Sequence, residues 1–140
     1  MRIDAILLLA VSLLSATAAA DARQDYMLNC MGCHLADGSG SPPAIPRLQD
    51  QVGYFLTIPH GRAYLAQVPG AANSLLSDAR LADVLNWIVE QYSGASAPAD
   101  WQRYDAAEVG SYRNARPGDI DGLRKQLTAE LERAHPVSGY

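Results

Sequence analysis

Apolar residues recur at helical spacing in several segments of this 140-residue chain. The clearest segment covers residues 77–93. Ser77 is a suitable N-cap there, and the charge of Asp78 in the first turn suits the helix dipole. Gly94 marks the end of the segment. One continuous apolar stripe is made of Leu81, Val84, Leu85, Ile88 and Tyr92. This pattern predicts an amphipathic helix that buries one face.

Shorter helices are predicted before this segment. Residues 22–31 place Tyr26, Met27 and Cys30 on one side of a short helix. Residues 36–47 are rich in glycine, serine and proline, and are predicted to form a loop. Two weaker helical segments, each ending before a proline, are residues 48–58 and 61–68. Since no stretch alternates apolar and polar residues with a period of two, we expect an all-α fold.

The C-terminal part of the chain is predicted to be helical as well. Residues 93–100 have the composition of a linker, and Asp105 and Glu108 after them form a capping-box pattern. A last helix is expected from about Pro117 to Ala134. It carries a narrow apolar face among its charges, made of Ile120, Leu123, Leu127 and Leu131.

The N-terminus has the pattern of a secretory signal. Arg2 is followed by an apolar run over residues 6–14, and Ala18 and Ala20 precede Asp21 in an A-x-A-like cleavage pattern. The run is shorter than the about 20 apolar residues of a membrane-spanning helix. We therefore expect residues 1–20 to be removed and the product to be periplasmic and not membrane-spanning. The net charge of −4 and the lack of a basic cluster give no support for nucleic-acid binding.

Both cysteines of the chain fall in one motif, CMGCH, at residues 30–34. In an oxidising compartment a disulfide is the default expectation for such a pair. C-x-x-C-H is also the attachment signature of c-type haem. Two thiols one turn apart can each form a thioether with one vinyl group of the same porphyrin, and the next residue then carries its imidazole under the iron. We expect Cys30 and Cys33 to anchor haem c and His34 to be the proximal iron ligand.

Other chemistries of a C-x-x-C pair fit less well. A structural zinc site needs four nitrogen or sulfur ligands, and outside the motif the chain offers only His60 and His135. A thioredoxin-like motif expects a preceding strand in a βαβ unit, and no strand is predicted. A plain disulfide would leave the adjacent histidine without a role.

From about Gln24 to Ser93 the chain resembles a class I (mono-haem) cytochrome c domain. In that family an aromatic residue one turn before the first cysteine packs on an aromatic of the last core helix, as expected here for Tyr26 and Trp87. The resemblance implies residues 21–94 as a small helical domain around one haem. Residues 95–140 would then be a linker and a helical C-terminal extension that such domains do not require.

The resemblance also implies roles for the loop after the motif. Pro46-Arg47-Leu48 matches the family's Pro-x-Leu, in which the proline carbonyl accepts the Nδ1–H of the proximal histidine and the leucine covers the ring. Such a bond fixes the tautomer and makes the imidazole a better donor to iron. Arg47 and Arg62 are candidates to pair with the haem propionates.

The chain departs from the family on the distal side of the haem. Val68-Pro69 stands where Met-Pro is expected, and after the signal only Met27 and Met31 remain, both tied to the attachment segment. Two interpretations stay open. His60 could be the distal ligand, which would give a lower potential than methionine ligation. Alternatively the iron is five-coordinate or closed by water, with an apolar distal pocket at Val68.

No constellation of acid, base and nucleophile accompanies the motif, so we do not expect an enzyme. The sequence favours a periplasmic carrier of single electrons between redox partners, from a dehydrogenase to a cytochrome or oxidase. Two alternatives are a haem protein that binds NO, CO or peroxide at an open iron, and a haem subunit of a dehydrogenase complex.

Overall fold

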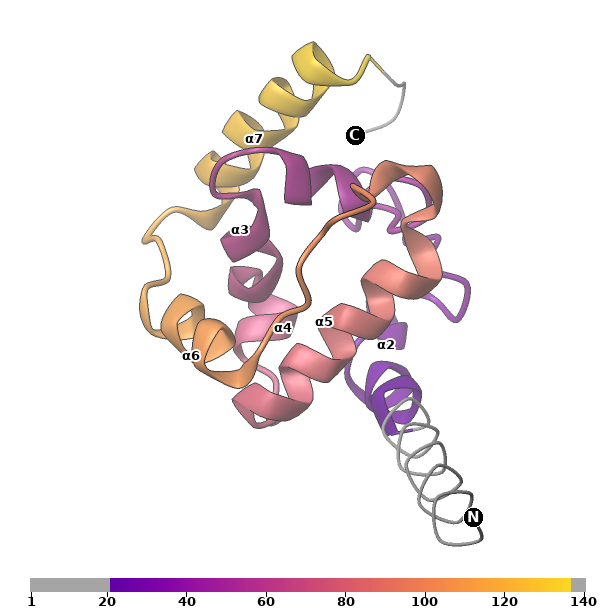
Figure 1. Ribbon diagram of the computed structural model, residues 1–140, viewed down its shortest axis with the longest axis vertical. Coiled ribbons are helices and arrows are strands. Elements are labelled where there is room, and N and C mark those ends of the chain that lie inside the picture. Colours follow the sequence, from indigo (N-terminus) through magenta and orange to yellow (C-terminus); the bar gives the residue numbers. More distant parts are fainter. Residues whose placement is uncertain (1–20, 137–140) are drawn as a thin grey trace, which may run out of the picture.

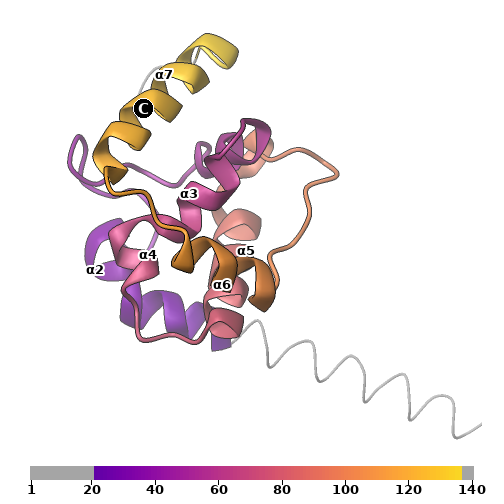
Figure 2. The same cartoon turned by 90° about the vertical axis from the view of Figure 1, so that its left-hand side faces the viewer.

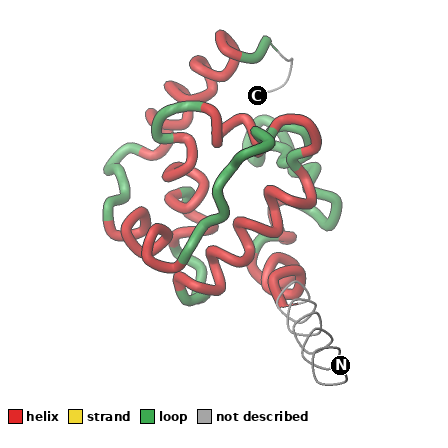
Figure 3. Tube along the Cα trace, in the orientation of Figure 1, coloured by secondary structure: helices red, strands yellow, loops and turns green. Residues whose placement is uncertain are grey.

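The computed structural model describes residues 21–136, so the predicted signal over residues 1–20 lies outside the described residues. All regular structure in this part of the chain is helical, apart from one isolated bridge between Ser41 and Ile45 (Figure 3). The predicted all-α fold class is confirmed. Within residues 21–136, every helix is too short or too polar to cross a membrane.

The order of helices follows the predicted segments, with local differences (Figure 1). A short helical turn after Val68 was not predicted, and the last helix begins three residues later than expected because Asp119 is its N-cap. After a helix over residues 21–29 come α2 (Met31–His34), η1 (Val52–Thr57), α3 (Gly61–Gln67), α4 (Pro69–Ala72), α5 (Asp78–Tyr92), η2 (Gly94–Ser96), α6 (Ala106–Asn114) and α7 (Ile120–Ala134).

The N-terminal helix packs against α5. The Tyr26 and Trp87 rings lie with centroids 5.0 Å apart, so the expected aromatic contact is present. An ion pair that the sequence did not predict joins the same two helices: the Arg80 guanidinium binds the buried carboxylate of Asp25 through both oxygens. The apolar contact and the bidentate pair together hold the attachment segment against α5.

Helix α5 has the predicted cap and buried face. The Ser77 hydroxyl accepts a hydrogen bond from the Arg80 amide at 3.3 Å, and Asp78 stands in the first turn. Of the predicted stripe only Tyr92 is half-buried, because it lies in the last turn. The buried members are Leu81, Val84, Leu85 and Ile88.

The segment after η2 returns across the body of the molecule before α6 begins (Figure 1). Tyr104, near its end, is buried, and its backbone amide donates to Asn86 Oδ1 at 2.7 Å while the Asn86 amide donates back to its carbonyl. Tyr104 and Val109 belong to the same buried cluster as Tyr26 and Val84. The C-terminal extension therefore completes the core of the preceding helices.

Helix α7 makes a second, smaller cluster on the other side of α3. Figure 2 shows α6 lying against α5 and α7 standing beyond α3. The predicted face is the one that docks: Leu127 and Leu131 are buried against Ile58 and Tyr64. The second cluster is thus built from α7, α3 and the residues around η1.

Candidate haem site

The motif residues lie at the junction between the N-terminal helix and α2. Cys30 is half-buried, Cys33 is exposed, and both are free thiols. Burial raises the pKa of the Cys30 thiol to about 11, with further contributions from the charges of Asp25 and Cys33. The Cys30 thiol is therefore protonated at neutral pH. Both sulfurs are free to form thioethers.

His34, at the end of α2, is oriented by the loop that follows it. Its Nδ1 lies 3.2 Å from the Pro46 carbonyl oxygen, which can only accept, so Nδ1 carries the proton. Burial lowers the pKa of His34, the Pro46 bond partly offsets this, and the charge of Arg124 lowers it further. The imidazole is thus neutral near pH 7, and Nε2 has no hydrogen-bond partner within residues 21–136. A neutral ring with a free nitrogen is what an iron ligand requires.

Glycine is required in the loop that presents the Pro46 carbonyl. Gly40 has φ +68°, and a Cβ there would lie 2.6 Å from the Pro46 oxygen. The loop is also closed by a hydrogen bond of 2.7 Å from the Leu48 amide to the Gly38 carbonyl. Leu48 itself is half-buried against the main cluster. A side chain at residue 40 would displace the acceptor of the His34 bond.

Two tyrosines fix the backbone immediately after His34. The Tyr26 hydroxyl donates to the Leu35 carbonyl at 2.7 Å, and the Tyr92 hydroxyl donates to the Ala36 carbonyl at 2.9 Å. Leu35 has φ 56° and ψ 170°, a conformation that is strained for any residue with a Cβ. These bonds hold the strained residue in place. The sequence indicated the Tyr26 ring but gave no signal for either hydroxyl.

The two candidates for the distal side lie around α3. His60 is exposed and occupies the N-cap of α3 with φ 63°, and its imidazole makes no hydrogen bond among the described residues. Helix α3 packs mainly on η1 and on α4, α5, α6 and α7. Val68 caps the other end of α3 and packs on the Tyr64, Leu127 and Leu131 cluster.

Some side chains proposed from sequence are engaged elsewhere. Arg62 binds Glu108 through two bonds, of 2.5 and 2.7 Å, and its guanidinium lies 4.0 Å from the centre of the Tyr104 ring. The charge of Arg62 is therefore compensated by α6, and its pairing with a propionate stays a prediction. His135 stacks on Tyr54 at 4.4 Å, and its Nε2 lies 3.1 Å from the Thr57 hydroxyl.

The donor set fits haem better than the other chemistries of such a motif. Within residues 21–136 there is no group of three or more His, Cys, Asp or Glu side chains placed to hold a metal ion, which a zinc site would need. Two free thiols one turn apart, followed by a neutral and oriented imidazole, match covalent haem instead. Met27 is 42% exposed whereas Tyr26 is buried, so the two side chains do not share a buried face, contrary to the prediction.

Comparison with known proteins identifies two similar chains. The chain is 31% identical over 132 residues to a protein named cytochrome c-552 from Thermus thermophilus, covering 80% of this chain and 88% of that protein. A second protein named cytochrome c-552, from the same species, is 30% identical over 128 residues, covering 77% of this chain and 97% of that protein. No family model and no solved structure matches. Since 80% of 140 residues is about 112, more than residues 1–94 contain, the similarity extends into the C-terminal segment.

Proposed function

The chain belongs to the c-type cytochromes, electron-transfer proteins that carry haem c, and from this premise we propose that it carries single electrons through one haem attached at Cys30 and Cys33. The observation that carries the proposal is the hydrogen bond of 3.2 Å between His34 Nδ1 and the Pro46 oxygen, next to two free thiols. The haem supplies the one-electron chemistry, and the chain supplies attachment, an axial ligand and burial.

Each residue of the site has a separate task in this proposal. Cys30 and Cys33 attach the porphyrin through thioethers, and His34 binds the iron through Nε2. Pro46 keeps the proton on Nδ1, so Nε2 stays available and the ring keeps its orientation. The tyrosine bonds to the Leu35 and Ala36 carbonyls prevent α2 from turning relative to the core. A fixed site limits rearrangement when the iron changes its oxidation state.

His60 is the proposed distal ligand. The last methionine in the sequence is Met31, which belongs to the attachment segment, so no later methionine can bind the iron. The imidazole of His60 makes no hydrogen bond within the described residues, and its positive φ of 63° is uncommon for a residue other than glycine, a feature that often accompanies function. Bis-histidine ligation would give a lower potential than histidine and methionine ligation.

An open sixth position is the second candidate, and it has its own support. His60 is exposed at the start of α3, and Val68 contributes only an apolar side chain at the end of α3. In this version the iron binds a small ligand such as CO or NO.

Optical and electron paramagnetic resonance spectra of the purified ferric protein decide between the two candidates. Bis-histidine ligation predicts a low-spin spectrum without the near-infrared band of methionine sulfur, converted to high-spin by His60→Ala. The matched control is His135→Ala, since His135 has other partners and should leave the spectrum unchanged. A high-spin spectrum in the unmutated protein that changes on adding CO would refute His60 ligation and support the open site.

We further propose that the carrier works in the periplasm, between a dehydrogenase and a downstream acceptor. One support is the predicted signal over residues 1–20. The other is that thioether attachment requires the C-x-x-C-H segment to be exported and its cysteines to be reduced. The test is cell fractionation, followed by stopped-flow reduction of the purified protein by candidate dehydrogenases. Rapid electron exchange without peroxide turnover would support a carrier, and peroxide turnover without exchange would contradict it.

A further inference from the structure

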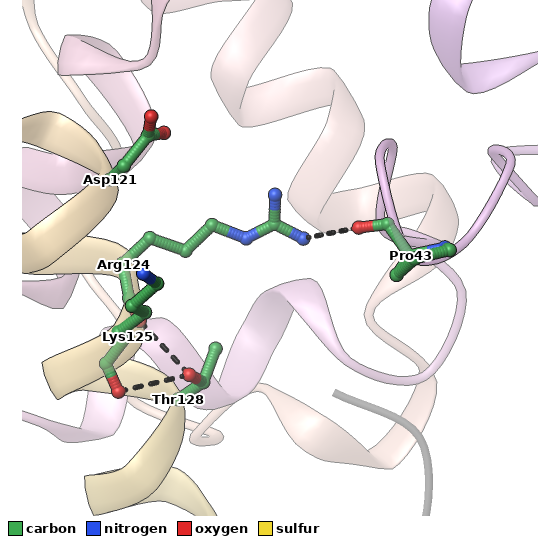
Figure 4. Close-up of a pocket in the computed structure, with 5 residues that line it drawn as sticks. All are labelled: Pro43, Asp121, Arg124, Lys125 and Thr128. Atoms are coloured by element: carbon green, nitrogen blue, oxygen red, sulfur yellow. Dashed lines mark hydrogen bonds between the residues drawn. The ribbon is translucent and has the colours of Figure 1, made fainter.

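A cavity of about 320 Å³ lies between α7 and the loop over residues 36–47. Figure 4 shows Arg124 extended from α7 across this cavity toward Pro43, with Lys125 beside it. The guanidinium donates to the carbonyls of Pro43 and Ala44, both at the long distance of 3.3 Å. The remaining lining residues are Asp121 and Thr128. The cavity therefore joins the C-terminal helix to the loop that orients His34.

The cavity has an excess of positive charge. Neither Arg124 nor Lys125 forms an ion pair within residues 21–136, and the carboxylate of Asp121, one turn earlier, binds neither of them. The Thr128 hydroxyl donates to the Arg124 and Lys125 carbonyls of its own helix. Two cations and one carboxylate leave a net charge of about +1. A site of this charge suits a carboxylate ligand, because a guanidinium binds carboxylate more strongly than a neutral carbonyl.

The position of Arg124 relates the cavity to the haem site. Its partners Pro43 and Ala44 precede Pro46, the acceptor of the His34 bond, by two or three residues. Arg124 therefore binds the same loop that presents the Pro46 carbonyl to His34.

We propose that Arg124 and Lys125 bind the propionate carboxylates of the haem in this cavity. The inference rests on the haem attachment proposed above. Thioethers to Cys30 and Cys33 hold the vinyl edge of the porphyrin, so the propionates at the opposite edge need partners elsewhere in the chain. Arg62 is less suited, because Glu108 already compensates its charge. Arg47, the other candidate from the sequence, is exposed and does not line the cavity. Arg124 and Lys125 are the cations beside the His34 loop that line a cavity and lack a carboxylate partner among the described residues.

Such pairing has a consequence for the iron. A propionate carboxylate without a nearby cation leaves negative charge close to the iron, which stabilises the ferric state. Arg124 and Lys125 neutralise this charge and therefore raise the reduction potential. The C-terminal helix would then be part of the cofactor site, in addition to its role in packing.

The experiment compares charge-removing variants of the purified holoprotein: Arg124→Gln, Arg124→Lys, Lys125→Gln and, as matched control, Arg133→Gln. Arg133 lies in the last turn of the same helix, is exposed, and does not line the cavity.

Resonance Raman spectra report hydrogen bonding of the propionates through their bending band, and redox titration gives the midpoint potential. We expect Arg124→Gln to shift the band and lower the potential, and Lys125→Gln to do the same to a smaller extent. Arg124→Lys should keep most of the potential while the band shifts, and Arg133→Gln should change neither.

Two results would overturn the inference. One is an unchanged propionate band in Arg124→Gln, together with a potential that moves no more than in Arg133→Gln. The other, decisive if Arg124→Gln does not fold, is an unaltered band in both Arg124→Lys and Lys125→Gln. Failure of the proposed function is a separate observation: the unmutated protein would then lack the pyridine haemochrome absorption of thioether-linked haem, and no propionate band could be measured.

Discussion

The two helices of the C-terminal extension are held to the rest of the protein in opposite ways. Helix α6 fully buries one side chain, Val109, packs Tyr112 partly on the same cluster, and is otherwise attached by polar contacts. The most extensive of these is made by Arg113, which donates to the Ala72, Ser74 and Leu76 carbonyls and to Asp78. Helix α7 instead docks through Leu127 and Leu131, with few polar contacts.

This difference shows that an apolar stripe is not the only means of fixing a helix. Gln67 Nε2 donates to the Tyr112 and Ala115 carbonyls at 3.1 Å, so the end of α3 is also tied to α6. Most of these acceptors are backbone carbonyls at helix ends and in the turn before α5, which need partners when water is excluded. Helix α6 therefore stabilises the segment over residues 72–78 by satisfying its backbone, whereas α7 stabilises its neighbours by excluding water.

The largest expected effect is the loss of the α7 core contact. Leu131→Ala should destabilise the protein by about 3 kcal/mol, since it leaves a cavity beside Tyr64 and Ile58. Chemical denaturation followed by far-ultraviolet circular dichroism measures it. The control is Leu123→Ala on the same face, which is half-buried and should cost about half as much. Equal costs for both variants would contradict the proposed docking face.

Removal of the Arg113 side chain tests the polar attachment of α6. Arg113→Ala should cost about 2 kcal/mol, because it leaves backbone carbonyls of residues 72–76 without a donor. Arg116→Ala is the matched control: it removes one exposed bond to Asn73 and should cost about 0.5 kcal/mol or less. Thermal unfolding of the two variants gives the comparison, and similar melting temperatures would show that the Arg113 contacts contribute little.

The ion pair between α6 and Arg62 predicts that the stability of the protein depends on acid. The hydrogen bonds from Arg62 hold the pKa of Glu108 below 4.5. The pair therefore contributes its full stability above pH 4.5, and this contribution is lost as the pH falls through the lowered pKa. Glu108→Gln should lower the free energy of unfolding by only about 1 kcal/mol at pH 7, since the side chains of Arg62 and Glu108 are both partly exposed. The variant should also flatten the dependence of stability on pH in this range. An unaltered acid dependence in Glu108→Gln would exclude Glu108 as its source.

The smallest expected effect concerns the end of α7. His135→Ala removes the stacking on Tyr54 and the contact with Thr57, and should cost about 0.5 kcal/mol. Amide hydrogen exchange of the last turn of α7 is the suitable measurement, with faster exchange expected there and no change in α6. A change spread over both helices would mean that the two are not attached independently.

Local features were predicted well because their signals lie within a few residues. The caps at Ser77 and Asp105 are present as expected, and the Asp105 carboxylate accepts from the Glu108 amide at 2.8 Å. The apolar faces of α5 and α7 also follow from periodicity. The short turn α4 could not be predicted in this way, since four residues are too few to show a period.

Polar partners distant in the chain could not be found by such reasoning. Arg62 and Glu108 are separated by 46 residues, and nothing in the spacing of either residue indicates the other. The sequence therefore suggests Arg47 and Arg62 as partners of the haem and gives no reason to consider Arg124, which follows Ala44 by 80 residues. From the sequence alone, a charged side chain on a predicted helix is expected to be exposed to solvent. Its partners become known only when the structure shows which part of the chain packs against it.

The sequence by itself determined the all-α class, the helical periodicity and the C-x-x-C-H segment, because these depend on local backbone geometry and on residue chemistry. Only the tertiary structure decided how the charged residues are used. It engages Arg62 with α6, places Arg113 on the turn before α5, and leaves Arg124 and Lys125 without carboxylate partners, among the described residues, beside the His34 loop. The physical reason is that ion pairs and hydrogen bonds require close approach in space, which the chain order of distant residues does not specify.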